Sequence, residues 1–209
     1  MSIVWRCQLS VDEYVTAGKS IDVPRPGCPD CETLMRFRSG YWRDVRAGSG
    51  SGRLVWIRRA QCGPCRRSHA LLPSFLLGRR LDAVEVIGAV VELVTDGVAV
   101  AGRVAKAAGL PYTTARDWLR RFSARAPMLA AGFVALAVEV GAEAGIDGLA
   151  IGAQRRAVGA LRLVGEVLGS SSGSLWALAS LVTGGKLLAS ATDPPWTVLG
   201  SRRFMPPVP

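Results

Sequence analysis

The sequence is poor in the residues from which most active sites are built. Its 209 residues include one histidine, His69, and 16 acidic residues against 26 basic ones. The acidic residues are scattered over separate predicted elements, so no three of them form the metal-binding cluster that a nuclease or transposase core requires. No glycine-rich phosphate-binding loop follows a predicted strand. We therefore expect a protein without catalytic activity of its own, that is, not an enzyme.

The beginning of the chain lacks the pattern of a secretion signal, because no basic stretch is followed by an apolar run. Cysteine is also scarce, with five residues in the chain. A disulfide framework is characteristic of short secreted proteins, and it is not expected here. We expect a cytoplasmic protein associated with the nucleoid.

Four of the five cysteines form two Cys-x-x-Cys pairs, Cys28-Pro-Asp-Cys31 and Cys62-Gly-Pro-Cys65. Two thiolates at positions i and i+3 of a tight turn can face one metal ion, and two such turns supply the four corners of a tetrahedron. Proline and glycine inside the pairs favour the sharp turn. A thioredoxin-like redox motif normally uses one such pair. The spacing predicts a structural zinc site of the zinc-ribbon type, with no open coordination position.

Two further residues could take part in this site or stand apart from it. His69 follows Cys65 by four residues. We expect it to pack or hydrogen-bond beside the metal, the alternative being that it replaces one cysteine as a ligand. Cys7 has no partner in the pattern and is expected to be a free or buried thiol.

The positive charge is concentrated in the part of the chain that carries the cysteines. The formal net charge is +10, and residues 36–80 contain eleven arginines against one acidic residue, Asp44. A concentrated basic surface most often binds nucleic acid. A GC-rich genome also favours arginine over lysine, so arginine identity alone argues little. We expect seven of these arginines to contact phosphates: Arg36, Arg38, Arg43, Arg58, Arg59, Arg66 and Arg67.

The hydrophobic periodicity changes from strand-like to helical near residue 81, which predicts an α+β fold. Alternating runs indicate strands over 34–38, 41–46 and 53–61, with a glycine-serine hairpin tip between the last two and a further strand over 68–75. Residues 1–27 form a leader of unassigned structure whose apolar residues are expected to cover the ribbon. We expect four parts along the chain: a leader and zinc ribbon (1–80), a helix-turn-helix (81–126), a helical bundle (127–193) and an extended tail (194–209).

The middle segment has the pattern of a helix-turn-helix, with helices predicted over 81–96, 99–108 and 115–125 and a break at Pro127. Ala105 is small where two helices cross, and Gly109 enters the turn, after which Thr113 or Thr114 is expected to be the N-cap. The alternative is three packed helices whose arginines are merely solvated. We expect the third helix to contact DNA through Thr113, Thr114, Arg116, Arg120 and Arg121, with Asp117 either reading cytosine or pairing with an arginine.

The last third is rich in alanine, leucine, valine and glycine, and helical segments are predicted over 128–144, 153–168 and 175–189. The uncharged run that starts at Met128 ends at Glu139. It is therefore shorter than the ~20 residues that cross a bilayer, and no membrane partner is expected. We predict a small helical bundle that offers a face for a homodimer or another partner.

Two stretches resemble known proteins: the run Trp56-Ile-Arg-Arg-Ala-Gln-Cys62-Gly-Pro-Cys65-Arg-Arg-Ser-His69-Ala-Leu-Leu-Pro73, and the Thr-x-x-x-Trp-Leu-x-Arg helix from Thr114 to Arg121. Together they resemble zinc-ribbon plus helix-turn-helix proteins associated with insertion sequences, in particular an actinobacterial group. The resemblance implies binding to double-stranded DNA at element ends or an operator. The chain lacks the catalytic domain of a full transposase, which implies an accessory or regulatory role beside a transposase or recombinase. The rival hypothesis is an adaptor that docks on a recombinase or polymerase through the ribbon and the apolar helices.

Overall fold

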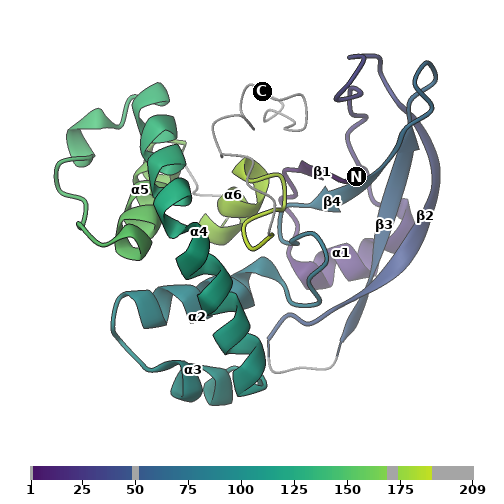
Figure 1. Cartoon of the computed structure of the whole chain (residues 1–209). Coiled ribbons are helices and arrows are strands. Elements are labelled where there is room, and N and C mark those ends of the chain that lie inside the picture. The colour runs from purple at the N-terminus through teal and green to yellow at the C-terminus, as the bar shows by residue number, and fades with distance from the viewer. Residues whose placement is uncertain (1, 49–51, 169–173, 190–209) are drawn as a thin grey trace.

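The fold is α+β, as the change of periodicity predicts, in a computed structural model that describes residues 2–48, 52–168 and 174–189. A four-stranded sheet lies on one side and a group of helices on the other (Figure 1). The elements in chain order are β1 (Ser2–Trp5), α1 (Val11–Ala17), η1 (Gly18–Ser20), β2 (Arg36–Val45), β3 (Arg53–Gln61), β4 (Ser68–Pro73), α2 (Val84–Thr95), α3 (Ala101–Ala107), α4 (Tyr112–Glu139), η2 (Glu143–Gly145), α5 (Ala153–Val167) and α6 (Leu175–Val182).

The sheet has the strand order β1-β4-β3-β2 and is mixed. Strands β2 and β3 form an antiparallel hairpin in which Trp42 pairs with Trp56, and β4 runs antiparallel to β3. Strand β1 pairs parallel to β4, with Ile3 opposite Leu71. The two runs predicted over 34–38 and 41–46 are one strand, β2, with a register shift between Phe37 and Gly40.

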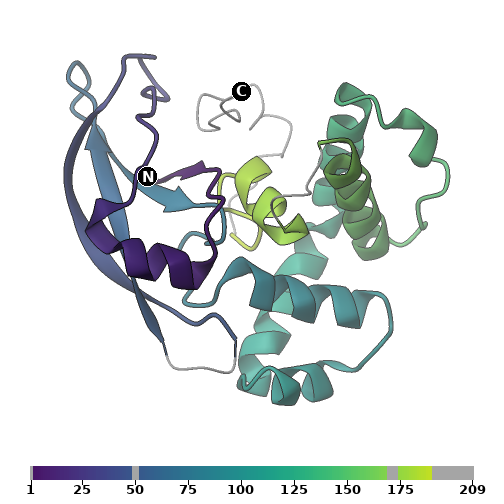
Figure 2. The same ribbon diagram turned by 180° about the vertical axis from the view of Figure 1, so that it is seen from behind.

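The leader completes the sheet and covers it. Helix α1 begins with a capping box in which the Ser10 and Glu13 side chains each bond the other's backbone N–H. It lies across β3 on the face of the sheet seen in Figure 2. There the buried Tyr14 donates its hydroxyl to the carbonyl of Trp56 at 2.9 Å and meets the ring of Phe75 edge-on. The apolar leader residues therefore cover the sheet.

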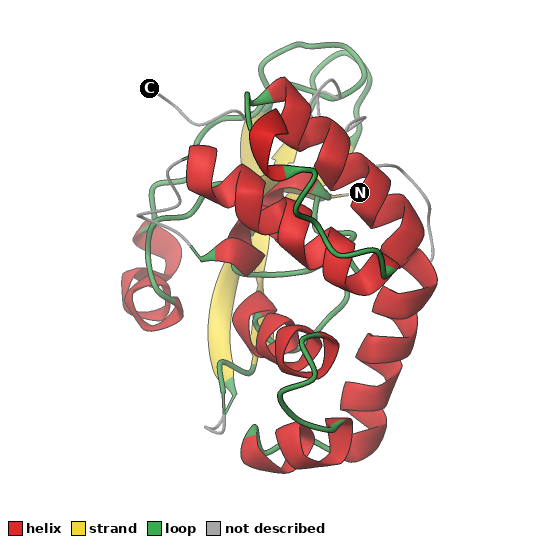
Figure 3. Cartoon of the chain, turned by 90° about the vertical axis from the view of Figure 1, so that its left-hand side faces the viewer, coloured by secondary structure: helices red, strands yellow, loops and turns green. Residues whose placement is uncertain are grey.

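The sheet and the helices share one continuous hydrophobic core. Helix α2 buries Val84, Ile87, Val90 and Val91, the face that the helical period predicts. Figure 3, seen from the helical side, shows the helices lying in front of the sheet. The start of α2 is also tied to the hairpin by backbone hydrogen bonds, because Arg46 donates to Leu81 and Ala83 donates to Arg46.

The helix break expected at Pro127 is wrong. Helix α4 runs without interruption from Tyr112 to Glu139 and so crosses the boundary proposed between the second and third parts of the chain. Proline removes one backbone hydrogen bond of a helix interior and costs about 3 kcal/mol. Burial on both sides of the proline offsets that cost, because Phe122 and Ala126 before it and Leu129 and Phe133 after it all lie in the core.

Helix α4 is also the one helix, among the residues described, that is long and apolar enough to cross a membrane on length and composition. Half of its most apolar window is buried inside the protein. The central helix of a soluble core passes the same test, so this property by itself is weak evidence for a membrane span.

The two ends of the hairpin of β2 and β3 lie far apart, and α3 lies toward the end where β3 begins (Figure 1). Strand β3 ends at Gln61, next to Cys62, and the other end of the hairpin is bridged from Arg46 to Asp82. Strand β2 has ten residues. At ~3.3 Å per residue, the two ends are separated by roughly 30 Å.

Candidate metal centre and nucleic-acid surface

Each Cys-x-x-Cys pair sits in a turn of the same design. The backbone N–H of Cys28 donates to the carbonyl of Thr33, and that of Cys62 donates to the carbonyl of Arg67, both at 2.9 Å. Both turns contain a residue with positive φ four positions after the first cysteine, Glu32 at 58° and Arg66 at 60°. A reversal of the chain at these points aims both thiols of a pair into the space between the turns.

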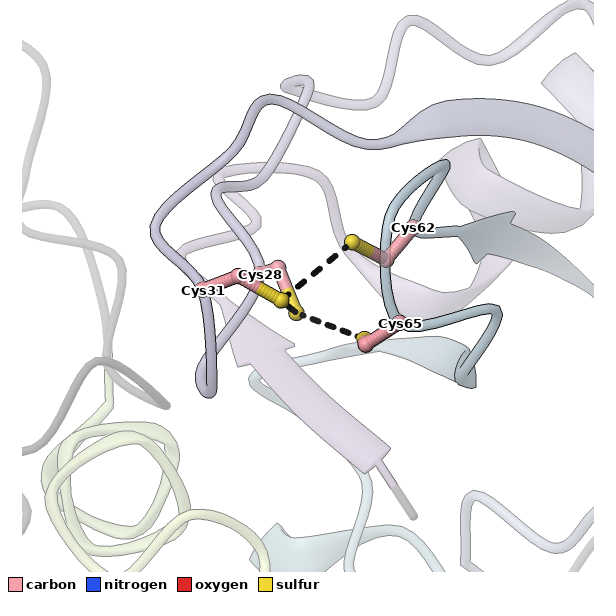
Figure 4. A group of neighbouring side chains, drawn as sticks. All are labelled: Cys28, Cys31, Cys62 and Cys65. Carbon is pink, nitrogen blue, oxygen red and sulfur yellow. Dashed lines mark hydrogen bonds between the residues drawn. The ribbon is translucent and has the colours of Figure 1, made fainter.

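The two turns bring the four predicted cysteines together (Figure 4). The sulfurs of Cys28 and Cys31 are 3.6 Å apart, as are those of Cys28 and Cys65, and those of Cys31 and Cys62 are 3.7 Å apart. A tetrahedron with a metal–sulfur distance of ~2.3 Å has an edge of ~3.8 Å. The spacing is much longer than the ~2.05 Å of a disulfide. The cluster can therefore hold one metal ion, as expected from the sequence.

The electrostatics of the cluster favour a cation. Burial acts to raise the pKa of the Cys28 thiol, but hydrogen bonds from the backbone N–H groups of Asp30 and Cys31 and contacts with neighbouring thiols outweigh it and lower that pKa to about 7. Hydrogen bonding to Cys65 and burial raise the pKa of Cys31 to about 12. Four thiolates at these distances repel one another, and a bound divalent cation would remove that conflict.

His69 lies beside the cluster. Strand β4 places it opposite Ala60, where it is 1% exposed. Its ring forms a second close group with Cys28 and the carboxylate of Asp30. Cys7, by contrast, is a buried free thiol in the segment that follows β1, and burial raises its pKa to about 11.

Several of the arginines proposed for phosphate contact have partners within the protein. Arg67 pairs with Asp30 at 2.7 Å, and Arg38 donates to the Gln61 side chain. The Arg58 guanidinium lies 4.9 Å from the centre of the Phe37 ring and donates to the carbonyl of Lys19. Three other members of the set, Arg36, Arg59 and Arg66, are exposed.

Arg43 faces the protein interior, so its proposed phosphate contact is not supported by its position. Its guanidinium donates to the carbonyls of Leu77, at 2.8 Å, and Arg80. Burial lowers its pKa. Arg43 therefore braces the loop that leads from β4 to α2.

Helices α3 and α4 are joined by a short turn at residues 108–111. Gly109 takes a φ of 64°, which favours glycine, and Leu110 donates its N–H to the carbonyl of Ala105 at 2.9 Å. Ala105 and Trp118 are buried where the two helices pack. The expected N-cap at Thr113 or Thr114 is wrong, because α4 begins at Tyr112 with Pro111 before it, and both threonines lie inside the first turn.

The first two turns of α4 present an exposed polar face. Thr113, Arg116 and Arg120 are exposed, and the Arg116 guanidinium lies 5.8 Å from the centre of the Tyr112 ring. Asp117 accepts from Arg120 at 2.8 Å and from Arg121 at 2.7 Å, and these hydrogen bonds lower its pKa. Of the two alternatives for Asp117, the structure supports the arginine pair. Of Arg116, Arg120 and Arg121, only Arg116 is therefore not bonded to Asp117.

A groove between the loop after β4 and the first turns of α4 was not expected from the sequence. Its volume is about 360 Å³. Arg79 and Arg80, which line it, were missed because nothing in their neighbourhood along the chain links them to α4. The run Gly78-Arg79-Arg80 between a strand and a helix does not specify a groove. We call this feature the arginine groove; its lining residues are Arg46, Arg79, Arg80, Leu81, Asp82, Thr113, Thr114, Asp117 and Trp118.

Fold and site together define an α+β protein with a four-cysteine group that can bind a metal ion. In sequence, residues 28–106 match a family described as a domain of unknown function (DUF6431). The match starts at the first cysteine of the cluster and ends in α3. No curated protein and no solved structure matches the chain.

Proposed function

We propose that this chain is a zinc-dependent DNA-binding protein without catalytic activity. The observation that carries the proposal is the exposed face of Thr113, Arg116 and Arg120 on α4, the second of two helices joined by a glycine turn. An amphipathic helix with threonine and arginine at its start suits phosphate and base-edge contacts in a major groove.

Zinc is the ion that best suits the cluster. Four thiolates are soft ligands and select zinc or iron over calcium and magnesium, which prefer oxygen. Cys28 and Cys62 are buried, and four sulfurs complete a tetrahedral shell, so the metal has a structural role. Such a metal would pin the two turns at the end of the hairpin that lies farthest from the helices.

DNA contact by the ribbon rests on its exposed arginines. Arg36, Arg59 and Arg66 lie in the strands and turns near the cysteines. Arg36 begins β2, so it lies roughly 30 Å from the other end of that strand, and Arg59 lies two residues before the end of β3.

The biological setting follows from the resemblance to insertion-sequence proteins. The chain would bind element ends or an operator as an accessory factor or regulator and work beside a transposase or recombinase, in the cytoplasm at the nucleoid. The helices at the C-terminal end would serve a homodimer or that partner.

A mobility-shift titration of zinc-loaded protein on duplex DNA tests the proposal. We expect binding at low salt that weakens steeply with salt, because each neutralised phosphate adds about −0.9 to the slope of log affinity against log salt concentration. Selection from a random duplex pool would then identify the preferred site. Absence of duplex binding at low salt, with the metal present, overturns the proposal.

The adaptor hypothesis is the second candidate, and one feature favours it. A hollow of about 720 Å³ between α2, α4 and the start of α5 is lined by apolar residues, among them Val94, Leu119, Phe122 and Leu149. Ile151 at its rim is 98% exposed. Co-purification of a stoichiometric recombinase or polymerase subunit without nucleic acid would favour this function over DNA binding.

A further inference from the structure

The arginine groove has an excess of positive charge. Both carboxylates of its lining already have basic partners: Asp82 pairs with Arg46 at 2.9 Å, and Asp117 pairs with Arg120 and Arg121. Arg79 and Arg80 add two more guanidinium groups to the lining. The groove therefore favours an anionic occupant over a cation.

The positions of the two added arginines are fixed by the fold. The half-buried Arg43 donates to the carbonyls of Leu77 and Arg80, and Arg80 itself donates to the carbonyl of Leu188 at 3.1 Å. Arg79, between these braced residues, is exposed and has a φ of 59°. This backbone conformation is uncommon for a residue with a side chain, and it holds Arg79 at the rim of the groove.

Hydrogen-bond donors complete the opposite wall. Thr113 and Thr114 lie in the first turn of α4 and bring two hydroxyls to this wall, whereas the backbone N–H of Thr114 already donates to the carbonyl of Pro111 at 3.0 Å. Hydroxyls, backbone N–H groups and guanidinium forks together form the donor set that proteins use for phosphate oxygens. In the lining, Nε of Arg46 is a buried donor with no hydrogen-bond partner among the described residues. The groove thus retains a guanidinium N–H that the protein itself does not use, whereas the unpaired Oδ1 of Asp82 is an acceptor and offers nothing to a phosphate.

We infer that the arginine groove binds a phosphate group, which in the complex is a backbone phosphate of duplex DNA. The assignment of this phosphate group to DNA rests on the proposed function. The groove opens beside the face of α4 that carries Thr113 and Arg116, so a phosphate held there would fix the depth and angle at which α4 enters the major groove. A volume of about 360 Å³ is roughly ten times the ~30 Å³ that a water molecule occupies, which leaves room for a hydrated phosphate.

Arg79→Gln tests this inference, because Arg79 is exposed and its loss should leave the fold intact. In salt titrations on one duplex, the slope of log affinity against log salt should become shallower by about 0.9, the value for one lost phosphate contact. Arg156→Gln, a substitution on α5 outside the groove and outside the proposed DNA surface, is the matched control and should keep the wild-type slope. Circular dichroism and the unfolding midpoint verify that both variants fold.

A second measurement uses inorganic phosphate alone. At matched ionic strength, phosphate in place of chloride should raise the unfolding temperature of the wild type and of Arg156→Gln, and should raise that of Arg79→Gln less. A wild-type salt slope in Arg79→Gln, or equal protection of both variants by phosphate, overturns the inference while DNA binding stands. If the wild type binds no duplex, the proposed function fails, and the phosphate measurement alone then decides whether the groove is an anion site.

Discussion

Gly88 of α2 lies against the indole ring of Trp176 of α6, so closely that a β-carbon at position 88 would come within 2.0 Å of the ring. Residue 88 is separated from this partner by most of the helical region of the chain. The indole N–H of Trp176 also donates to Glu92 one turn later, at 3.2 Å. The contact therefore fixes the position of α6 on α2, and through α2 the position of α6 relative to the sheet.

Gly88→Ala should destabilise the protein. The added methyl group must displace a buried tryptophan, and overpacking of this kind costs about 1–3 kcal/mol, more than the ~1 kcal/mol that alanine gains over glycine in a helix. Urea unfolding measures the change. Gly102→Ala on α3 is the control, because the nearest atom to its added methyl group is 3.9 Å away and the site is exposed. Gly102→Ala should be more stable than the wild type. Equal stabilisation by Gly88→Ala and Gly102→Ala would contradict the close contact between Gly88 and Trp176.

The cysteine cluster could be predicted from the sequence, and much of the rest could not, for one physical reason. Two cysteines three residues apart are brought together by a single turn, so their spacing carries the information. The parallel pairing of β1 with β4 joins Ile3 to Leu71, and no local pattern links segments so far apart in the chain. The same holds for Arg79 and Thr113, which share a groove only after the helices have packed.

The error at Pro127 has the same origin. Backbone chemistry at one residue favours a break, and the sequence pattern reports that local preference. The buried residues before and after the proline contact other helices, and their packing energy is set by neighbours that the local pattern does not contain. The N-cap prediction at Thr113 failed in the same way, since α4 already begins at Tyr112.

Loss of one metal ligand should release the metal. Cys62→Ser removes a buried sulfur from the cluster, and structural zinc contributes on the order of 10 kcal/mol in small zinc domains, so the loss of stability should be large. Elemental analysis should find one zinc ion per wild-type chain and less than one in the variant. Cys7→Ser is the control: it also removes a buried thiol, but one outside the cluster, and its metal content should match that of the wild type. One zinc ion per chain in Cys62→Ser would show that zinc is not bound by these four cysteines.

Arg43→Met should lower the stability of the protein, because it leaves two backbone carbonyls without their hydrogen-bond donor. The carbonyls of Leu77 and Arg80 lose their guanidinium partner, and an unsatisfied buried polar group costs about 1–3 kcal/mol. Arg36→Met on the same strand is exposed and should change the free energy of unfolding by less than about 0.5 kcal/mol. Thermal and urea denaturation of both variants checks the difference. An equal change in the free energy of unfolding for both would indicate that Arg43 contributes no more than an exposed surface arginine.

Arg116→Ala and Arg120→Ala distinguish base readout from phosphate contact. If either side chain reads a base, its loss should cost about 1–3 kcal/mol on the preferred site and relax the preference at one position. The structure predicts a larger effect at Arg116, because Asp117 already holds Arg120. Binding to a preferred and a scrambled duplex is compared for each variant. Equal weakening on both duplexes would assign α4 to phosphate contact alone.

Asp117→Asn should strengthen DNA binding. Asp117 neutralises Arg120 and Arg121 at 2.8 and 2.7 Å, and asparagine keeps the size of the side chain while it removes the charge. Two guanidinium groups then become available to phosphates, so affinity at low salt should rise and the salt slope should steepen by up to about 0.9 for each new contact. Asp147→Asn, an exposed acidic position in the loop before α5, is the control for the change of net charge. If Asp117 instead accepted a hydrogen bond from a cytosine, the variant would lose affinity on the preferred site while its binding to other sequences held or rose. The sign of the change on the preferred duplex therefore decides between an ion pair that restrains the helix face and a direct contact to a base.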